Sequence, residues 1–364
     1  MIIFLYLSRE LLKSFVAITV VLTTVFVVSR FSMYLGDAAA GYISGDVVWR
    51  ILLFRMPSFL ELVLPLAWFL AVMLSFGRFY VDSEMAVLRA CGHSKARLLR
   101  YTLGPSVLVM TAVFMLTVWL TPVGWDKFNA LYEKASQSSN FSALVPGSFR
   151  RLNDQRNTVI YTGGLEDKKS VLRDVFMFQQ TPEQGLLLVR ADSGRIVYEQ
   201  DATYVELQQG THTQGKFRQL DFTVMQFERF GQLMRQDREP LETVETEDTK
   251  STTQLWQSSS VRDRATLHWR LGLPFLVPIG AMIALALSET SHRRGRYKKL
   301  LPGVVILMAY LISLIGMRLG VAKGTIPHVA FFWLVHVIFL LLGSMLLFSD
   351  QWRVTWQTVR RAGK

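Results

Sequence analysis

The sequence predicts an α-helical membrane protein with six transmembrane helices and an all-β jelly-roll domain inserted between helices 3 and 4. Three observations support this fold class: six long apolar stretches, a polar block between the third and the fourth, and an uneven placement of positive charge. Hydrophobic residues make up 51% of the 364 residues, although the chain carries 40 Lys and Arg. The apolar residues are therefore concentrated in the stretches that meet lipid.

The six apolar stretches are long enough to cross a membrane as helices. A bilayer core of roughly 30 Å requires about 20 residues per helix. The stretches that meet this length are 11–28, 51–76, 103–120, 267–288, 300–319 and 328–348. The fourth contains Pro274 and Pro278, which predict a kink; this kink is either a fixed structural feature or a gate.

The placement of Lys and Arg predicts the orientation. Basic residues that flank membrane spans stay in the cytoplasm, and here they gather at both termini and in the segments 78–100 and 293–299. The short loops 36–50 and 320–327 contain only Arg50 and Lys323. Both termini are therefore predicted to be cytoplasmic and the polar block to be outside. The net charge of +12 reports this topology, so no nucleic acid partner is expected.

The segment 78–100 is too polar to cross the membrane and has the pattern of a short cytoplasmic helix. Its apolar residues Val81, Met85, Leu88 and Cys91 fall near one helical face. Two interpretations remain open at this point. The segment is either a basic helix at the membrane surface or a helix that docks to a partner.

The polar block has short strand patterns separated by turn residues. The strand patterns lie at 157–163, 173–180, 186–192, 194–200, 203–210 and 217–230. Such spacing is typical of a sandwich or jelly roll. We therefore divide the chain into residues 1–127 with helices 1–3, residues 128–266 as the β-domain, and residues 267–364 with helices 4–6 and a basic tail. Within the block, 243–260 is poor in apolar residues and is predicted to be a linker.

The sequence contains no motif for intrinsic catalysis. GxxxxGK[ST], HExxH, CxxC and GxSxG are absent, and the six histidines have no metal-ligand spacing. Cys91 is the single cysteine, so no intramolecular disulfide can form. We therefore expect no enzyme activity, no metal and no cofactor in this chain.

Cations near the outer ends of the spans form the candidate binding group. Burying a charge in lipid is costly, yet five basic residues lie at about one membrane depth: Arg30, Arg55, Arg270, Arg318 and Lys323. They either form a ring for an anionic amphiphile or extend separately to the headgroups. Glu61 is either a counter-ion to Arg55 or part of a polar pathway.

Three stretches resemble the lipopolysaccharide export permease family, and the resemblance covers essentially the whole chain. They read MIIFLYLSRELLKS (1–14), FGRFYVDSEMAVLRACGHSKARLL (76–99) and ATLHWRLGLPF (265–275). The most specific piece, SEMAVLRACGHSK, is closer to the F-type permease than to its G-type sibling. The resemblance implies an inner-membrane subunit of an ATP-binding-cassette exporter with a periplasmic β-domain.

The same resemblance implies the partners. Family members pair with a G-type sibling on a dimeric cytoplasmic ATPase, which uses ATP and Mg²⁺. They extract lipopolysaccharide and pass it to a single-span periplasmic bridge protein with a similar β-domain. The family's coupling helix corresponds to about 80–91, where Glu84 is expected to engage the ATPase, together with Met85, Leu88 and Arg89.

The resemblance also gives the cation group a substrate, because lipid A carries phosphates at that depth. Arg30 is the position transferred most directly, whereas Glu61 departs from the family pattern. Acyl chains would need an apolar groove in the β-domain, although ordinary core packing explains the candidate residues equally well. These candidates are Phe176, Phe178, Leu187, Val189, Ile196, Phe222, Val224 and Phe227.

Two other functions fit the lack of motifs. In one, the chain is a mechanotransmission or scaffold protein whose outer domain binds a periplasmic protein, and no lipid moves. This alternative gives no reason for the outer cations. In the other, the chain is a secondary transporter, which does not need a large β-insert.

Overall fold

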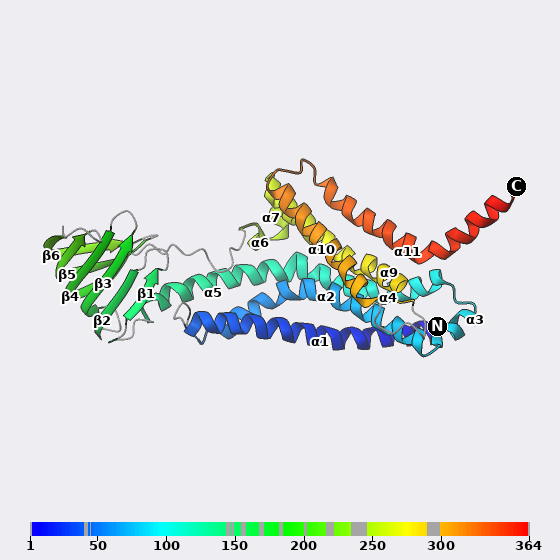
Figure 1. The fold of residues 1–364 in the computed structure, drawn as a ribbon, viewed down its shortest axis with the longest axis horizontal. Helices are drawn as coiled ribbons and strands as arrows, with labels where there is room; N and C mark the ends of the chain where they lie inside the picture. Colours follow the sequence, from blue (N-terminus) through cyan, green and yellow to red (C-terminus); the bar gives the residue numbers. More distant parts are fainter. Residues whose placement is uncertain are drawn as a thin grey trace. The chain divides into compact units, whose positions relative to one another are not determined.

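The computed structural model describes most of the chain, and Figure 1 shows its elements. The described residues are 2–39, 43, 45–142, 147, 149–153, 158–166, 171–181, 185–199, 202–215, 222–233, 246–289 and 299–362. They divide into two compact units. The helical unit contains Met1–Ser32, Trp49–Ala130 and Val244–Lys364, and the β-unit contains Met33–Val48 and Leu131–Thr243.

Six helices in the described residues are long and apolar enough to cross a membrane, which confirms the predicted spans. The first two are α1 (Ile2–Ala39) and α2 (Val48–Val81). The third is one continuous helix of α4 (Lys95–Met115), the π-helical turn η1 (Leu116–Leu120) and α5 (Thr121–Ser142). The short helix α3 (Glu84–Ala90) connects α2 to α4, as predicted.

The last three spans follow the β-unit in the sequence. Span four consists of α8 (Val261–Gly272), the 3₁₀ turn η2 (Leu273–Phe275) and α9 (Leu276–Leu287). The irregular turn contains Pro274, which lacks the N–H that a regular helix would use. Span five is α10 (Leu300–Ala322) and span six lies in α11 (Ala330–Ala362).

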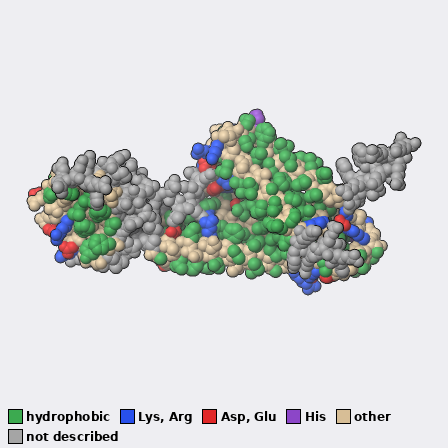
Figure 2. Space-filling view, in the orientation of Figure 1, with side chains coloured by type: hydrophobic (Ala, Val, Ile, Leu, Met, Phe, Trp, Pro, Cys, Tyr) green, Lys and Arg blue, Asp and Glu red, His purple; other side chains and the backbone are tan. Residues whose placement is uncertain are grey.

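Apolar side chains build both the core and the surface of the helical unit. The buried cluster includes Trp68, Phe69 and Phe76 of α2 and Leu273 of η2. Trp68 Nε1 donates to Ser106 Oγ of α4 at 2.9 Å, so its one polar group is satisfied inside the core. Figure 2 shows hydrophobic side chains over most of the visible face and charged ones toward the two ends of this unit. This surface suits a lipid environment.

The β-unit contains one antiparallel sheet in the described residues, with its six strands in chain order (Figure 1). The all-β insertion between the third and fourth spans is therefore confirmed. The strands are β1 (Phe149–Asn153), β2 (Thr158–Glu166), β3 (Val171–Thr181), β4 (Gly185–Glu199), β5 (Ala202–Gly215) and β6 (Phe222–Leu233).

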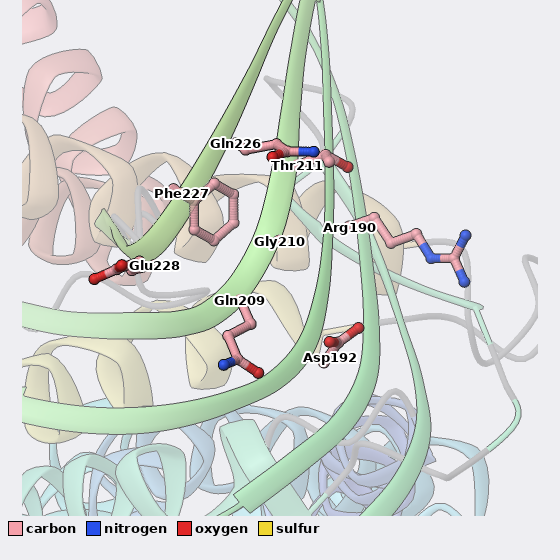
Figure 3. A pocket seen from close by; sticks show the side chains of 8 residues that line it. All are labelled: Arg190, Asp192, Gln209, Gly210, Thr211, Gln226, Phe227 and Glu228. Atoms are coloured by element: carbon pink, nitrogen blue, oxygen red, sulfur yellow. The ribbon is translucent and has the colours of Figure 1, made fainter.

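One row of residues across the sheet departs from regular strand geometry. Asp174 of β3 and Gln209 of β5 have positive φ angles of 49° and 51°. The strands curve sharply at this level in Figure 3. Gly210 follows directly, and a Cβ there would collide with the Arg190 carbonyl and the Phe227 ring. The glycine therefore allows neighbouring strands to approach closely at the bend.

The β-domain differs from its predicted boundaries. Residues 128–266 were assigned to it, but Val244 onward belongs to the helical unit. The described part of the predicted linker instead forms the helices α6 (Thr246–Thr249) and α7 (Thr252–Gln257). We call residues 246–257 the strap. The reason for the difference is that side chains from α8 and α10 hydrogen-bond the strap, as described next.

Candidate functional site

Arg270 of α8 holds the strap in place. Its side chain is among the buried charged groups, with 3% of its surface exposed. Nη1 donates to the Lys250 carbonyl at 2.9 Å and to Thr252 Oγ1 at 3.1 Å. Nη2 donates to the carbonyls of Asp248 at 2.9 Å and Glu247 at 3.4 Å. The guanidinium therefore satisfies backbone acceptors of the strap, which a flexible linker would present to water.

Two further contacts attach the strap to the spans. Arg318 Nη2 of α10 forms a 2.6 Å ion pair with Asp248 Oδ1, and its guanidinium lies 5.6 Å from the Trp269 ring. Lys250 Nζ contacts both carboxylate oxygens of Asp263 at 2.8 and 2.9 Å. The strap is thus anchored to α8 and α10.

The π-helical turn η1 of the third span also contacts the strap. Thr252 Oγ1 donates to the Val118 carbonyl at 2.6 Å, and Thr117 Oγ1 donates to the Arg270 carbonyl at 3.0 Å. A π turn displaces carbonyls from the regular helical ladder and is frequent at functional sites. Here it brings the third and fourth spans and the strap into one network.

Glu61 is a buried carboxylate in α2 beside this network. Its Oε2 accepts a 2.8 Å hydrogen bond from Thr121 Oγ1, the first residue of α5. The charged groups that act on it electrostatically are Asp248, Arg318 and Arg270. Glu61 thus belongs to the polar group around the strap, which supports the polar-pathway interpretation.

The five predicted cations fall into different surroundings. Arg270 and Arg318 share the strap. Arg30 and Arg55 share Phe59, whose ring centroid lies 5.5 and 5.0 Å from their guanidinium carbons. Arg55 is buried and lies 3.6 Å from the Trp125 ring centroid, whereas Arg30 is half-buried and Lys323 is exposed. Four of the five cations therefore share neighbours in pairs, Arg270 with Arg318 and Arg30 with Arg55.

Helix α3 lies at the other end of the spans. Met85 is buried in the helical core and Leu88 packs against it. Tyr6 Oη of α1 donates to Glu84 Oε2 at 2.9 Å. Arg89 Nη2 donates to Glu289 Oε1 at 2.9 Å and to Tyr80 Oη at 2.8 Å. These four predicted coupling residues therefore face the spans or contact them.

The outward face of α3 carries different residues. Ala86, Ala90 and Cys91 are exposed, and Val87 is 62% exposed. This small apolar face borders the charged residues Asp82 and Arg89. The helical period predicts Cys91 on one face with Met85 and Leu88, but Cys91 follows the end of α3 and is exposed.

The eight predicted acyl-chain residues divide between the two faces of the sheet. Residues paired directly across strands share a face. Val189 pairs with buried Met177, and Phe227 pairs with Gly210 beside Ala191. By this register Leu187, Val189, Ile196 and Phe227 share the face of the buried cluster, although the Ile196 side chain lies outside the described residues.

The other four residues lie on the opposite face. Phe176 pairs with Tyr161 and Arg190, and Phe178 pairs with Val159 and Leu188. Phe222 and Val224 continue this face and are 51% and 62% exposed. The period of two residues in a strand separates adjacent positions, so the eight candidates do not form one lining.

A polar cavity of about 520 Å³ lies at the bend of the β-unit (Figure 3). Arg190 and Asp192 of β4 line it with Gln209 and Thr211 of β5. Gly210, Gln226, Phe227 and Glu228 complete the lining. Two carboxylates beside one guanidinium make this cavity a poor site for a lipid phosphate.

One run in β5 comes close to a phosphate-binding loop. Residues 210–217 read GTHTQGKF, with Phe217 where that motif requires Ser or Thr. Gly210 to Gly215 lie in a strand and pair with β4 and β6. A phosphate-binding loop instead precedes a helix N-terminus, whereas residues 210–215 are hydrogen-bonded within the sheet.

Sequence reasoning missed the strap, Glu289 and the contacts of Asp248 and Lys250. A signal for the strap was present, because Ser251 and Gln254 form a capping box in which each side chain bonds the other residue's backbone. Glu289 follows span four directly in the cation-rich end, but its partners lie 10 to 200 positions away. Such distant contacts leave no local pattern.

These features define a class: a multi-pass helical membrane protein with a β-domain inserted between its third and fourth spans. The sequence model of the family "Lipopolysaccharide export system permease LptF/LptG" matches residues 5–348, and the chain belongs to this family. It is 29% identical over 353 residues to the lipopolysaccharide export system permease protein LptF of Escherichia coli (strain K12), covering 96% of this chain and 95% of that protein. The LptF protein of Shigella flexneri matches with the same identity and coverage. The chain is thus a lipopolysaccharide export permease of the LptF type.

Proposed function

We propose that this permease is the transmembrane subunit of an ATP-driven exporter. It extracts lipopolysaccharide from the inner membrane and passes it through the β-domain to a periplasmic bridge protein with a similar domain. The two termini and α3 lie in the cytoplasm, and the strap and the β-domain lie on the periplasmic side. The positive charges at 293–299 and near both termini support this orientation.

Helix α3 is the proposed docking site for a separate ATPase subunit that supplies the energy. Its inward face is fixed by buried Met85, while Val87, Ala90 and Cys91 face outward. A dimeric ATPase using ATP and Mg²⁺ docks on this face and, in the same assembly, on a G-type sibling. The ATPase is separate because the chain has no nucleotide-binding motif.

The periplasmic ends of the spans receive the lipid headgroup. In the predicted group Arg30 is half-buried and Lys323 is exposed, and a basic pocket between spans suits an anionic headgroup. Trp49, Trp119 and Trp256 are exposed on α2, η1 and α7. Tryptophan prefers the membrane interface, so these side chains support placing the strap at headgroup depth.

The apolar face of the β-sheet receives the acyl chains. Leu187, Phe227 and Phe230 are partly buried against the inner cluster. They border the cluster without being sealed inside it, which suits a surface that exchanges protein contacts for lipid contacts. Phe176, Phe178, Phe222 and Val224 lie on the opposite face and are not part of this proposed path.

Reconstitution in proteoliposomes tests the proposal. The permease, its sibling and the ATPase are assembled with lipopolysaccharide, and ATP-dependent transfer to a soluble β-domain of the bridge protein is measured. Glu84→Arg is expected to abolish transfer. The substitution places a cation where the carboxylate accepts a hydrogen bond from Tyr6 and where, in this proposal, it engages the ATPase. Transfer by this variant at the normal rate would remove the coupling role of Glu84.

Photo-crosslinking from a probe at position 33, one helical turn from Arg30, tests the headgroup site. In the intact protein, Arg30→Glu is expected to reduce lipopolysaccharide crosslinked from a neighbouring probe at position 33, and Arg30→Lys to retain most of it. Equal crosslinking in both variants would return Arg30 to a simple interfacial role. Copurification of a periplasmic protein without lipid would favour the scaffold function.

A further inference from the structure

Glu289 joins four elements at the α3 end of the helical unit. It lies two residues beyond α9. Its Oε1 accepts from Arg89 Nη2 of α3 at 2.9 Å, and its Oε2 accepts from Lys95 Nζ, the first residue of α4, at 3.1 Å. Its backbone carbonyl accepts from Lys299 Nζ at 2.6 Å, and Lys299 is the N-cap of α10. One residue therefore contacts the starts or ends of spans three, four and five.

Helix α3 depends on such contacts for its position. It has seven residues, and a helix this short is not stable in isolation. Its side chains form two polar links to the spans: Glu84 to Tyr6 of α1, and Arg89 to Glu289 and Tyr80. The link through Glu289 is the one that leads to the second half of the chain.

We propose that Glu289 is the positioning residue that transmits displacement of α3 to the fourth and fifth spans. The inference rests on the proposed function, in which an ATPase moves α3. Arg89 pulls on the Glu289 carboxylate, and the adjoining backbone carries this displacement into α9 and, through Lys299, into α10. The role assigned to Arg89 thereby changes from an ATPase contact to an internal link.

The electrostatic surroundings fit this role. Burial raises the pKa of the Glu289 carboxyl, but hydrogen bonds from Arg89 and Lys95 outweigh it and leave the pKa below its ordinary value. The carboxylate thus stays charged at neutral pH, and both oxygens remain engaged. A carboxylate held by two cations from different helices restrains their relative position more than a single pair does.

A matched variant separates this role from a loss of charge. Glu10 of α1 is also a carboxylate at this end and forms ion pairs with Lys13 and Arg78. In the reconstituted complex, Glu289→Gln is expected to lower lipopolysaccharide transferred per ATP hydrolysed by at least about five-fold, the lower end of typical coupling between sites. Glu10→Gln is expected to retain the ratio. Equal ratios in the two variants would overturn the proposal.

A double-mutant cycle tests the link itself. If Arg89 acts through Glu289, then Arg89→Ala, Glu289→Ala and the double variant lower the transfer ratio by the same factor. Independent effects that multiply in the double variant would overturn the proposal. ATP-dependent transfer by the unmodified complex is the control for the proposed function, and its absence would reject that function rather than Glu289 alone.

A second measurement does not require the ATPase. The exposed Cys91 is replaced by Ser, and nitroxide labels are attached at Val87→Cys and Leu301→Cys, two exposed positions on α3 and α10. In the full chain in nanodiscs, Glu289→Ala is expected to broaden the distance distribution between the labels, and Glu10→Ala to leave it unchanged. An unchanged distribution with Glu289→Ala would overturn the link.

Discussion

Both ends of the helical unit hold their short helices partly by ion pairs, but they differ in their most buried contact. At the strap end, one buried guanidinium bonds three backbone carbonyls and a hydroxyl. At the α3 end, ion pairs join side chains that remain partly exposed, with Arg89 42% and Glu289 36% exposed. Buried bonds are costly to break, whereas exposed pairs are weak. By these contacts we expect the strap to be held more firmly than α3.

Removing Arg270 is expected to have the largest effect. Arg270→Gln leaves several carbonyls of the strap without donors, and each unsatisfied buried acceptor costs about 1–3 kcal/mol. The melting temperature in detergent should fall, and proteases should cut within 246–257 faster. Arg89→Gln, at the other end, is expected to change both by much less.

Arg270→Lys is the control for charge alone. An ammonium cannot span the acceptors that the planar guanidinium reaches with two nitrogens, so this variant should resemble Arg270→Gln. A strap as protease-resistant as in the unmodified protein would contradict the contrast between the two ends.

Thr121→Val is expected to have the second largest effect. The substitution keeps the shape of the side chain but removes the donor to Glu61, and an unsatisfied buried acceptor costs about 1–3 kcal/mol. The double variant Glu61→Leu/Thr121→Val removes both partners and is expected to lose less stability than Thr121→Val. Thermal unfolding in detergent measures both. A double variant that loses at least as much stability as Thr121→Val would show that Glu61 acts through other groups.

The spans and the α3 helix were predictable because hydropathy and helical period are local patterns. The strap was not, since its stability comes from Arg270 and Arg318, at positions that composition alone presents as lipid-facing cations. The same two residues show what could not be predicted about the site. The sequence gives the membrane depth of a charged side chain, but only the packed structure shows whether groups of the protein already bind that charge. In the β-domain, alternation was visible, yet Val189 and Phe176 lie on opposite faces because their phase depends on strand register.

High salt is expected to increase the mobility of α3 but not that of the strap, and this effect should be smaller than those of the substitutions above. At 1 M salt the screening length falls to about 3 Å, and exposed charges lose most of their attraction. A nitroxide at Val87→Cys, with Cys91→Ser, is expected to become more mobile in 1 M NaCl. A nitroxide at Trp256→Cys on the strap should not change. Equal changes at both positions would mean that the strap is held by screened charges as well.

Acid is expected to increase the mobility of α3, and this should be the smallest of the effects. The pKa of Glu289 in the folded protein lies below its ordinary value of 4.5, because hydrogen bonds from Arg89 and Lys95 outweigh the effect of burial. A group with a lowered folded pKa contributes stability above its ordinary value and loses it as the pH falls through the folded one. Mobility at Val87 is therefore expected to stay constant from pH 7 to about 5 and to rise only below 4.5.

The contribution that acid removes is small, about 0–1 kcal/mol for an exposed pair, so mobility is a better measure than unfolding. Four ionisable groups surround Glu289: Arg89 and Lys95 on its carboxylate, Lys299 on its backbone carbonyl, and Tyr80 through Arg89. Glu84 also lies on α3, so Tyr6→Phe, which removes its partner, serves as the control. With Glu289→Gln the acid response should vanish, whereas with Tyr6→Phe it should persist. A response that begins above pH 5, or persists in Glu289→Gln, would assign the release of α3 to another group and leave the ion pair as a surface contact.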